Sequence, residues 1–170
     1  MDYLIEKATP HQAEDILRLY HSLLGRDGCT WNEDYPNHED IDHDISNDAL
    51  YVLWDQNRMI ACASALEADE EEMLAYEGTK LKHPCALSRL AVSSAYQNKG
   101  IAKYLIAHIE KEIARNGYDG ICLLVSKDND HAKAVYDHMH YQCFSQCRMY
   151  DQDWYCYEKE LGEWKDHENA

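Results

Sequence analysis

The sequence predicts a single α/β domain of the mixed α+β kind, in which a central mixed sheet of six or seven strands is flanked by helices on both faces. The chain has 170 residues, 45% of them hydrophobic, which is enough for one packed core. In its second half, a strand-like run, an amphipathic helix and a buried strand-like run follow one another, which predicts a parallel pair with a right-handed crossover. Elsewhere, short apolar runs separated by polar turns predict antiparallel hairpins.

The first half is expected to begin with a strand over residues 3–8, followed by a helix. Thr9 is suited to cap this helix, Pro10 fits its first position and Gln12 completes a capping box. The apolar face continues to Gly25, which should end the helix. A short acidic helix is expected over residues 39–46, and its charged side chains should be solvated: His38, His43, Asp40, Asp42 and Asp44.

The rest of the chain completes the sheet. Residues 50–54 and 59–66 predict a hairpin. Residues 67–84 predict a long loop, or a strand plus a loop, whose acidic run, Asp69 to Glu72, lies in solvent. A strand at 85–92 should run parallel to one at 121–125, with a helix over 100–115 between them. A helix over 130–139 and strands at 141–150 and 154–161 complete a domain of residues 1–161, followed by a polar tail at 162–170.

The composition argues against several classes of function. The formal net charge is −16, whereas a phosphate backbone requires a basic face, so no nucleic-acid partner is expected. No apolar stretch has the length of a signal peptide or a membrane helix, which predicts a cytoplasmic protein without a membrane partner. The seven cysteines include no Cys-x-x-Cys pair, and His138, His140 and Cys143 fit no ligand set, so no metal is expected.

The segment from Leu90 to Lys103 carries the chemistry. A strand enters a tight turn, and the turn opens a long helix whose first N–H groups have no partner inside the helix. Such a helix start suits a pyrophosphate. Gly100 and Ala102 allow close approach of a ligand to the backbone, and Lys99 and Lys103 add positive charge in an otherwise acidic protein.

This segment resembles a known family. Gln97-x-x-Gly100-x-Ala102 is similar to the Arg/Gln-x-x-Gly-x-Gly/Ala signature of the GNAT superfamily of N-acetyltransferases, and Leu90-Ala91-Val92 resembles the cofactor-binding strand of that family. Asn129 and Tyr136 stand where the family has an asparagine and a tyrosine on its next helix. One position departs from the pattern, because His140 replaces the glycine usual after that helix and leaves the end of the helix in doubt.

The resemblance implies that acetyl-CoA is the cosubstrate and assigns residues to it. The main chain of the strand would bind the pantetheine arm, the turn would hold the pyrophosphate and the asparagine would bind the pantetheine. The implied cofactor-binding residues are Leu90, Ala91, Val92, Gln97, Asn98, Lys99, Gly100, Ile101, Ala102, Lys103 and Asn129. Tyr136 would lie near the sulfur, and a phenol there can protonate the departing thiolate.

The acceptor side is less specific. Trp31 and Tyr35 lie where the family builds its variable substrate wall, and aromatic faces can receive an ammonium group, although a loop that merely packs onto the sheet is an equal alternative. A base that deprotonates the amine could be Glu67, Glu77 or His83, which are candidates by location alone.

The expected activity is acetyl transfer to a primary amine by direct attack in a ternary complex. The acceptor is expected to be a small-molecule or peptide amine, and the protein a monomer or homodimer. Two alternatives stay open: a catalytically silent CoA-binding module used in sensing or assembly, and an acyltransferase that takes a longer acyl group.

Overall fold

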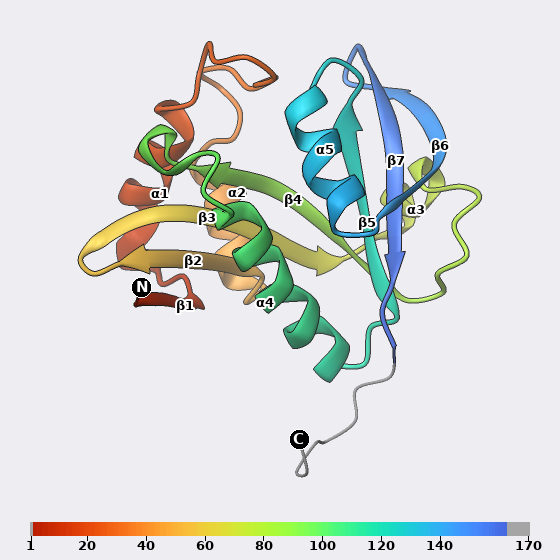
Figure 1. The fold of residues 1–170 in the computed structure, drawn as a ribbon, viewed down its shortest axis with the longest axis horizontal. Coiled ribbons are helices and arrows are strands. Elements are labelled where there is room, and N and C mark those ends of the chain that lie inside the picture. Colours follow the sequence, from red (N-terminus) through yellow and green to blue (C-terminus); the bar gives the residue numbers. More distant parts are fainter. Residues whose placement is uncertain (1, 163–170) are drawn as a thin grey trace.

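The computed structural model describes residues 2–162, which form a seven-stranded sheet with helices on both faces (Figure 1). The strand order is β1-β2-β3-β4-β5-β7-β6. The strands are β1 (Tyr3–Lys7), β2 (Leu50–Asp55), β3 (Arg58–Glu67), β4 (Pro84–Val92), β5 (Gly120–Ser126), β6 (Gln142–Met149) and β7 (Gln152–Glu160). The predicted polar tail, apart from Gly162, lies outside the described residues.

Five α-helices cover the sheet among the described residues. They are α1 (Ala13–His21), α2 (His38–Ser46), α3 (Glu70–Ala75), α4 (Ile101–Arg115) and α5 (Asp130–His138), and short 3₁₀ turns lie at Pro10–Gln12 and Ser94–Tyr96. The expected capping box is present, since the backbone N–H of Thr9 donates to Gln12 Oε1 at 2.9 Å, but it begins the 3₁₀ turn, and α1 itself starts only at Ala13. It ends at His21, four residues before Gly25.

Two hydrophobic layers hold the sheet between the helices. On one face, buried side chains of α4 such as Leu105 and Ile109 pack with Tyr136 of α5 against the inner strands. On the other face, Ile16 of α1 and Ile41 of α2 pack on Leu50 of β2. Tyr76, which follows α3, extends this second layer over Ala86 of β4 and Cys122 of β5. The strands between the two layers are therefore buried on both sides.

Residues 67–84, expected to form a loop or a strand plus a loop, contain an unexpected helix, whereas the acidic run is solvated as expected: Asp69, Glu70 and Glu71 are exposed and Glu72 is half-buried. The run forms helix α3, because Asp69 accepts a hydrogen bond from the Glu72 backbone N–H at 2.8 Å and Glu72 Oε1 accepts one from the Asp69 N–H at 3.2 Å. Acidic side chains in a first turn also complement the positive end of the helix dipole.

The predicted parallel pair is confirmed. It is β4 with β5, and every other neighbouring pair in the described sheet is antiparallel. The parallel register covers Pro84–Gly120, Cys85–Ile121 and Ala86–Cys122, after which the two strands diverge. None of the helices within residues 2–162 is both long and apolar enough to cross a membrane.

Candidate functional site

The divergence of β4 and β5 exposes the main chain of the predicted cofactor strand. β4 continues to Val92, but its pairing with β5 stops at Ala86, so its edge over residues 87–92 has no partner strand on that side within the described sheet. Leu90 and Val92 pack toward the α4 face, whereas Ala91 is buried toward α1 and α2. An extended chain can add to such an edge by main-chain hydrogen bonds.

A bulge in β4 contributes to the divergence. Ser88 faces Ser64 of β3 and Ala91 faces Cys62, so Arg89 and Leu90 together oppose a single residue of β3. Arg89 has a φ of 51°, in the left-handed region that bulky residues rarely occupy. A bulge bends its strand and redirects the side chains beside it, which here are next to the open edge.

The turn after β4 has the shape expected of an anion site. Gln97 Nε2 donates to the carbonyl of Val92 at 3.1 Å and ties the turn to the end of the strand. Asn98 and Gly100 have φ values of 63° and 78°, and α4 begins at Ile101. A Cβ added at Gly100 would meet no heavy atom within 4 Å, so the space beside it is open to a ligand. Backbone N–H groups of such a turn and of the helix start can converge on a phosphate.

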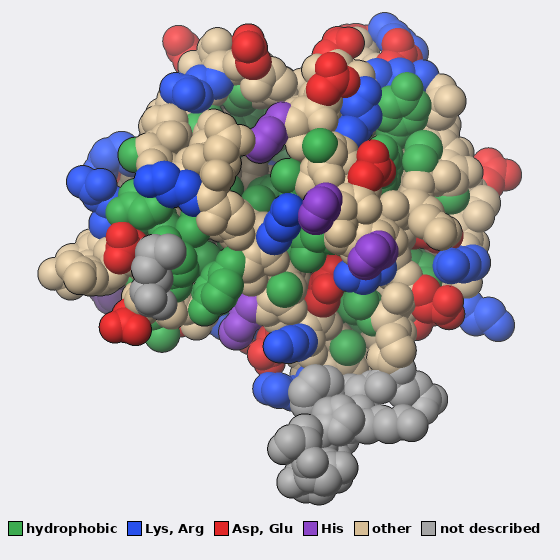
Figure 2. All heavy atoms as spheres, in the orientation of Figure 1, with side chains coloured by type: hydrophobic (Ala, Val, Ile, Leu, Met, Phe, Trp, Pro, Cys, Tyr) green, Lys and Arg blue, Asp and Glu red, His purple; other side chains and the backbone are tan. Residues whose placement is uncertain are grey.

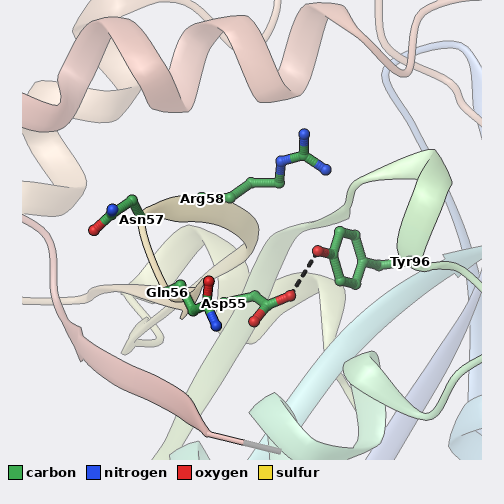
Figure 3. A pocket seen from close by; sticks show the side chains of 5 residues that line it. All are labelled: Asp55, Gln56, Asn57, Arg58 and Tyr96. Atoms are coloured by element: carbon green, nitrogen blue, oxygen red, sulfur yellow. Dashed lines mark hydrogen bonds between the residues drawn. The ribbon is translucent and has the colours of Figure 1, made fainter.

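A shallow open cavity of about 420 Å³ lies beside this turn, lined by Asp55 to Arg58 and Tyr96 (Figure 3). The Tyr96 hydroxyl donates to Asp55 Oδ2 at 2.7 Å, which fastens the start of the turn to the β2–β3 hairpin. Lys99 lies over the Tyr96 ring, with Nζ 5.5 Å from the ring centroid. The residues that line the cavity therefore support the turn, and none of them belongs to β5 or α5.

Tyr136 lies in the core between α5 and the sheet. Its side chain is 7% exposed and is in edge contact with Tyr141, with ring centroids 5.5 Å apart, while Tyr157 lies at 6.3 Å. Burial raises the pKa of Tyr136 above its usual value of about 10, since an ionised phenolate would lose its solvation. Burial therefore favours the neutral phenol.

Asn129 stands at the N-terminus of α5 and is already engaged. Its Oδ1 accepts from the backbone N–H of Ala132 at 3.0 Å, and its Nδ2 donates to the carbonyl of Gly28 at 3.3 Å. Gly28 belongs to the segment between α1 and α2, and a Cβ there would lie 2.8 Å from Asn129 Oδ1. Figure 2 shows the surface hollowed at its upper edge, between the α1–α2 segment and the lobe that contains α5.

The doubt about the end of α5 is resolved by His140. This residue adopts a φ of 70°, its N–H bonds the carbonyl of Asp137, and the Tyr141 N–H bonds the carbonyl of Tyr136 at 3.0 Å. These two bonds make the helix ending that glycine usually supplies. The Tyr141 hydroxyl also donates to Glu110 of α4 at 2.8 Å, which holds the two helices together.

The two aromatic residues predicted for the acceptor side have different surroundings. Trp31 is half-buried and contacts Tyr20 of α1 edge-on at 5.2 Å, which fits the alternative of a loop packed onto the domain. Tyr35 is 42% exposed, and its hydroxyl accepts a hydrogen bond from Arg89 Nη1 at 3.0 Å.

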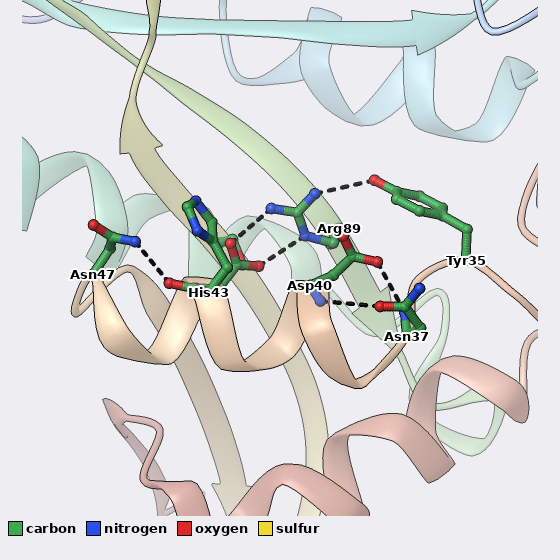
Figure 4. A network of polar contacts seen from close by, with 8 residues as sticks. Tyr35, Asn37, Asp40, His43, Asn47 and Arg89 are labelled. Carbon is green, nitrogen blue, oxygen red and sulfur yellow. Dashed lines mark hydrogen bonds and ion pairs between the residues drawn. The ribbon is translucent and has the colours of Figure 1, made fainter.

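Arg89 belongs to a buried polar network that sequence reasoning missed (Figure 4). Its Nε and Nη2 each donate to one oxygen of Asp44 at 2.8 Å, and Ser64 Oγ donates to Asp44 Oδ2 at 2.6 Å. Asp44 is fully buried, so the expectation that it is solvated was wrong. Two signals were present in the sequence: a lone charge within the apolar run of β4, and an acid three residues after Ile41 on the inward face of α2.

Of the three proposed bases, Glu77 is exposed in the segment between α3 and β4, whereas Glu67 and His83 lie together. His83 Nε2 lies 3.1 Å from Glu67 Oε1 and its ring stacks on Tyr118, at the end of β4 where the two parallel strands are still paired. At about 3.3 Å per residue, this end is roughly 20 Å from Leu90.

Glu72 of α3 is half-buried. Burial raises its pKa, and Arg89 is among the charges that act on it.

No group of three or more His, Cys, Asp or Glu side chains within residues 2–162 could hold a metal ion. The cysteines of this part of the chain are free thiols.

Solved structures share this architecture. An acetyltransferase of the GNAT family from Streptococcus agalactiae 2603 has a TM-score of 0.80 at 20% identity, over 95% of this chain and 96% of that one. NAA60 of Arabidopsis thaliana, solved with a bisubstrate analogue, has a TM-score of 0.70 at 17% identity, over 94% and 98% of the two chains. The ribosomal-protein-S18-alanine N-acetyltransferase of Escherichia coli has a TM-score of 0.67 at 16% identity, over 99% of each chain.

At these identities the likeness shows the fold. No curated protein matches the sequence. The sequence model of the acetyltransferase (GNAT) family matches residues 12–141, which include the open edge of β4, the turn before α4 and the whole of α5. The chain therefore belongs to the acetyltransferase (GNAT) family, whose general activity is acetyl transfer from acetyl-CoA.

Proposed function

We propose that this protein transfers the acetyl group of acetyl-CoA to a primary amine by direct attack in a ternary complex. The observation that carries the proposal is the divergence of β4 and β5 after Ala86 and Cys122, with the buried phenol of Tyr136 on the helix that follows β5. This arrangement supports the proposal, because an open strand edge, the start of a helix and a phenol belong to the elements around the divergence.

The cofactor is proposed to bind along the α4 side of the divergence. The pantetheine arm would pair with the free main chain of Leu90 to Val92, and the pyrophosphate would lie on N–H groups between Asn98 and Lys103. Support comes from the open space at Gly100 and from the left-handed φ values that bend the turn. Asn129 would reach the pantetheine only by giving up its bond to Gly28, because its Oδ1 already caps α5.

The chemistry needs few protein groups. The neutral amine attacks the thioester carbonyl, and a main-chain N–H near Leu90 would stabilise the oxyanion of the tetrahedral intermediate. Collapse of the intermediate breaks the carbon–sulfur bond, and the attacking nitrogen releases a proton to solvent. Tyr136 would donate its proton to the leaving thiolate and regain one from solvent. A phenol is protonated at neutral pH even at its ordinary pKa of about 10, so the support for this role is the position of Tyr136 on α5 and not its pKa.

The acceptor is proposed to be a cation in bulk solution. The first turn of α3 holds Glu70, Glu71 and Glu72, and the last two act electrostatically on Tyr150 at the tip of the β6–β7 hairpin. An ammonium group that approaches between these elements would be attracted before it loses its proton.

The test is a turnover screen of primary amines with acetyl-CoA, in which free CoA thiol is measured with and without amine. We expect amine-dependent thiol release and an acetylated amine in the product mixture. Binding of acetyl-CoA without amine-dependent release across the panel would identify the silent CoA-binding module instead. A larger rate with longer acyl-CoA donors would identify the other alternative.

A further inference from the structure

The contacts that fix the guanidinium of Arg89 do not use all of its N–H donors. Two of its five N–H groups are committed to Asp44 and a third to Tyr35 (Figure 4). The remaining two, one on each Nη atom, have no partner among the described residues. The side chain is 16% exposed, so these donors lie at the edge of the core rather than within it.

Tyr35 adds a third donor beside them. Its oxygen accepts the bond from Arg89 Nη1, which leaves its own hydrogen to donate, and the residue is 42% exposed. The pair therefore presents donors and no strong acceptor at this point of the surface. The complementary group is an oxygen atom that accepts more than one hydrogen bond.

The charge balance decides which kind of oxygen fits. The positive charge of Arg89 is paired with the fully buried carboxylate of Asp44 in a bidentate geometry. Glu71 and Glu72 add negative charge nearby, since both they and Arg89 act on Tyr150. A site that is neutral in sum and bordered by acids favours an uncharged carbonyl oxygen over a carboxylate.

Arg89 and Tyr35 lie on the α2 side of the sheet, from which the acceptor is proposed to approach. Arg89 immediately precedes Leu90, yet its guanidinium binds α2, on the face opposite α4. A cofactor that lies along the α4 side and an amine that attacks from the α2 side would meet beside this residue. An acceptor that carries a carbonyl oxygen next to its amine could then present the amine to the cofactor and the oxygen to Arg89 and Tyr35.

We propose that Arg89 and Tyr35 bind the first amide carbonyl oxygen of the acceptor, so that the enzyme selects amines one carbon away from an amide, as at the N-terminus of a peptide. This inference rests on the proposed acetyl transfer to an amine and names the acceptor class. Asp44 and Ser64 act as positioning residues, because Asp44 holds the guanidinium and Ser64 holds Asp44.

The experiment compares three acceptors on the wild-type protein: alaninamide, isobutylamine, which lacks the carbonyl, and alanine, whose oxygen atoms are anionic. Rates are expressed per concentration of neutral amine, because the amine pKa values of the three differ. We expect kcat/KM for alaninamide to exceed that for each of the others by about tenfold or more, the factor that about 1.4 kcal/mol supplies. A short peptide with a free N-terminus should behave like alaninamide.

Two variants assign the preference to its residues. Tyr35→Phe removes one oxygen from a partly exposed side chain, and Arg89→Lys keeps the charge but loses the planar donor fork. Each should lower the preference for alaninamide over isobutylamine while the KM for acetyl-CoA stays the same. The matched control is Arg18→Lys, an exposed arginine whose Nη1 lies 2.6 Å from Asp15 in α1.

The outcomes separate this inference from the proposed function. Equal rates for alaninamide and isobutylamine, or a preference that survives in both variants, would overturn the inference while acetyl transfer to amines stands. A higher rate with alanine would overturn it in favour of a carboxylate-bearing acceptor. If no amine of any kind is acetylated, the proposed function and this inference fall together.

Discussion

The guanidinium of Arg89 donates one 2.8 Å hydrogen bond to each carboxylate oxygen of Asp44, and so ties the bulge of β4 to helix α2. Asp44 is 0% exposed, so the two charges depend on each other for their solvation. Burial acts to lower the pKa of Arg89, but the hydrogen bonds and the charge of Asp44 outweigh it and raise that pKa, so the guanidinium stays ionised.

Asp44→Ala should lower the free energy of unfolding by about 3–5 kcal/mol, because it leaves the Arg89 charge buried without a partner. Urea unfolding measures the change. The matched control is Asp15→Ala, which removes an exposed partner of Arg18 and should change the stability by less than about 0.5 kcal/mol. Equal effects of the two substitutions would show that the buried ion pair contributes no more to the free energy of unfolding than the exposed one.

Gly100→Glu should abolish measurable acetyl-CoA binding in calorimetry. Its side chain would enter the open space beside the turn and repel phosphate, and the left-handed backbone at this position would be strained. Gly117→Glu is the control, since Gly117 has a φ of 92° and equally open surroundings but follows the far end of α4. Undiminished affinity in a folded Gly100→Glu protein would contradict the assignment of the cofactor site.

Tyr136→Phe should reduce the single-turnover rate by about 10²–10⁴-fold with little change in acetyl-CoA affinity, because the ring packing is kept and only the proton donor is lost. Tyr51→Phe is the matched control: Tyr51 is also a buried tyrosine whose pKa is raised by burial, but it lies on β2. A wild-type rate in Tyr136→Phe would return this side chain to a purely structural role.

Stability should fall as the pH rises above about 9. Burial raises the pKa of Cys62 to about 12, whereas thiols in the unfolded chain ionise near 8.5. Above that pH the unfolded state binds fewer protons than the folded state, so each such thiol lowers the free energy of unfolding by up to about 1.4 kcal/mol per pH unit. Burial acts in the same direction on Cys85, Cys122 and Cys156.

Cys62→Ala should make this alkaline slope shallower in urea unfolding between pH 9 and 10.5. Val52→Ala serves as the control, because Val52 is equally buried and its truncation also leaves a cavity but removes no titrating group. An unchanged slope in Cys62→Ala would mean that its thiol ionises alike in both states.

Much of the fold was predictable because its signals are local. The apolar run of β5 and the apolar periodicity of α4 each specify their own element, and together they imply the parallel crossover. Helix α3 was missed because four consecutive acids suggest an irregular surface segment, whereas the reciprocal bonds of Asp69 and Glu72 begin a helix whose acids remain in solvent.

The acceptor side could not be predicted for a different reason. The Arg89–Asp44 pair joins residues 45 positions apart, and no spacing rule relates a strand bulge to a helix face at that distance. Trp31 and Tyr35 have similar local sequence signals, yet one packs on Tyr20 and the other meets Arg89. Contacts of this kind depend on the completed tertiary structure.

The diverging strands also bear on the order of events in a catalytic cycle. α4 and α5 lie on one face of the sheet and α1, α2 and α3 lie on the other. The two substrates of the proposed reaction would therefore approach from opposite faces of the sheet. Neither substrate would block the path of the other. Spent CoA could depart while the acetylated product is still bound, and fresh cofactor could load before that product leaves.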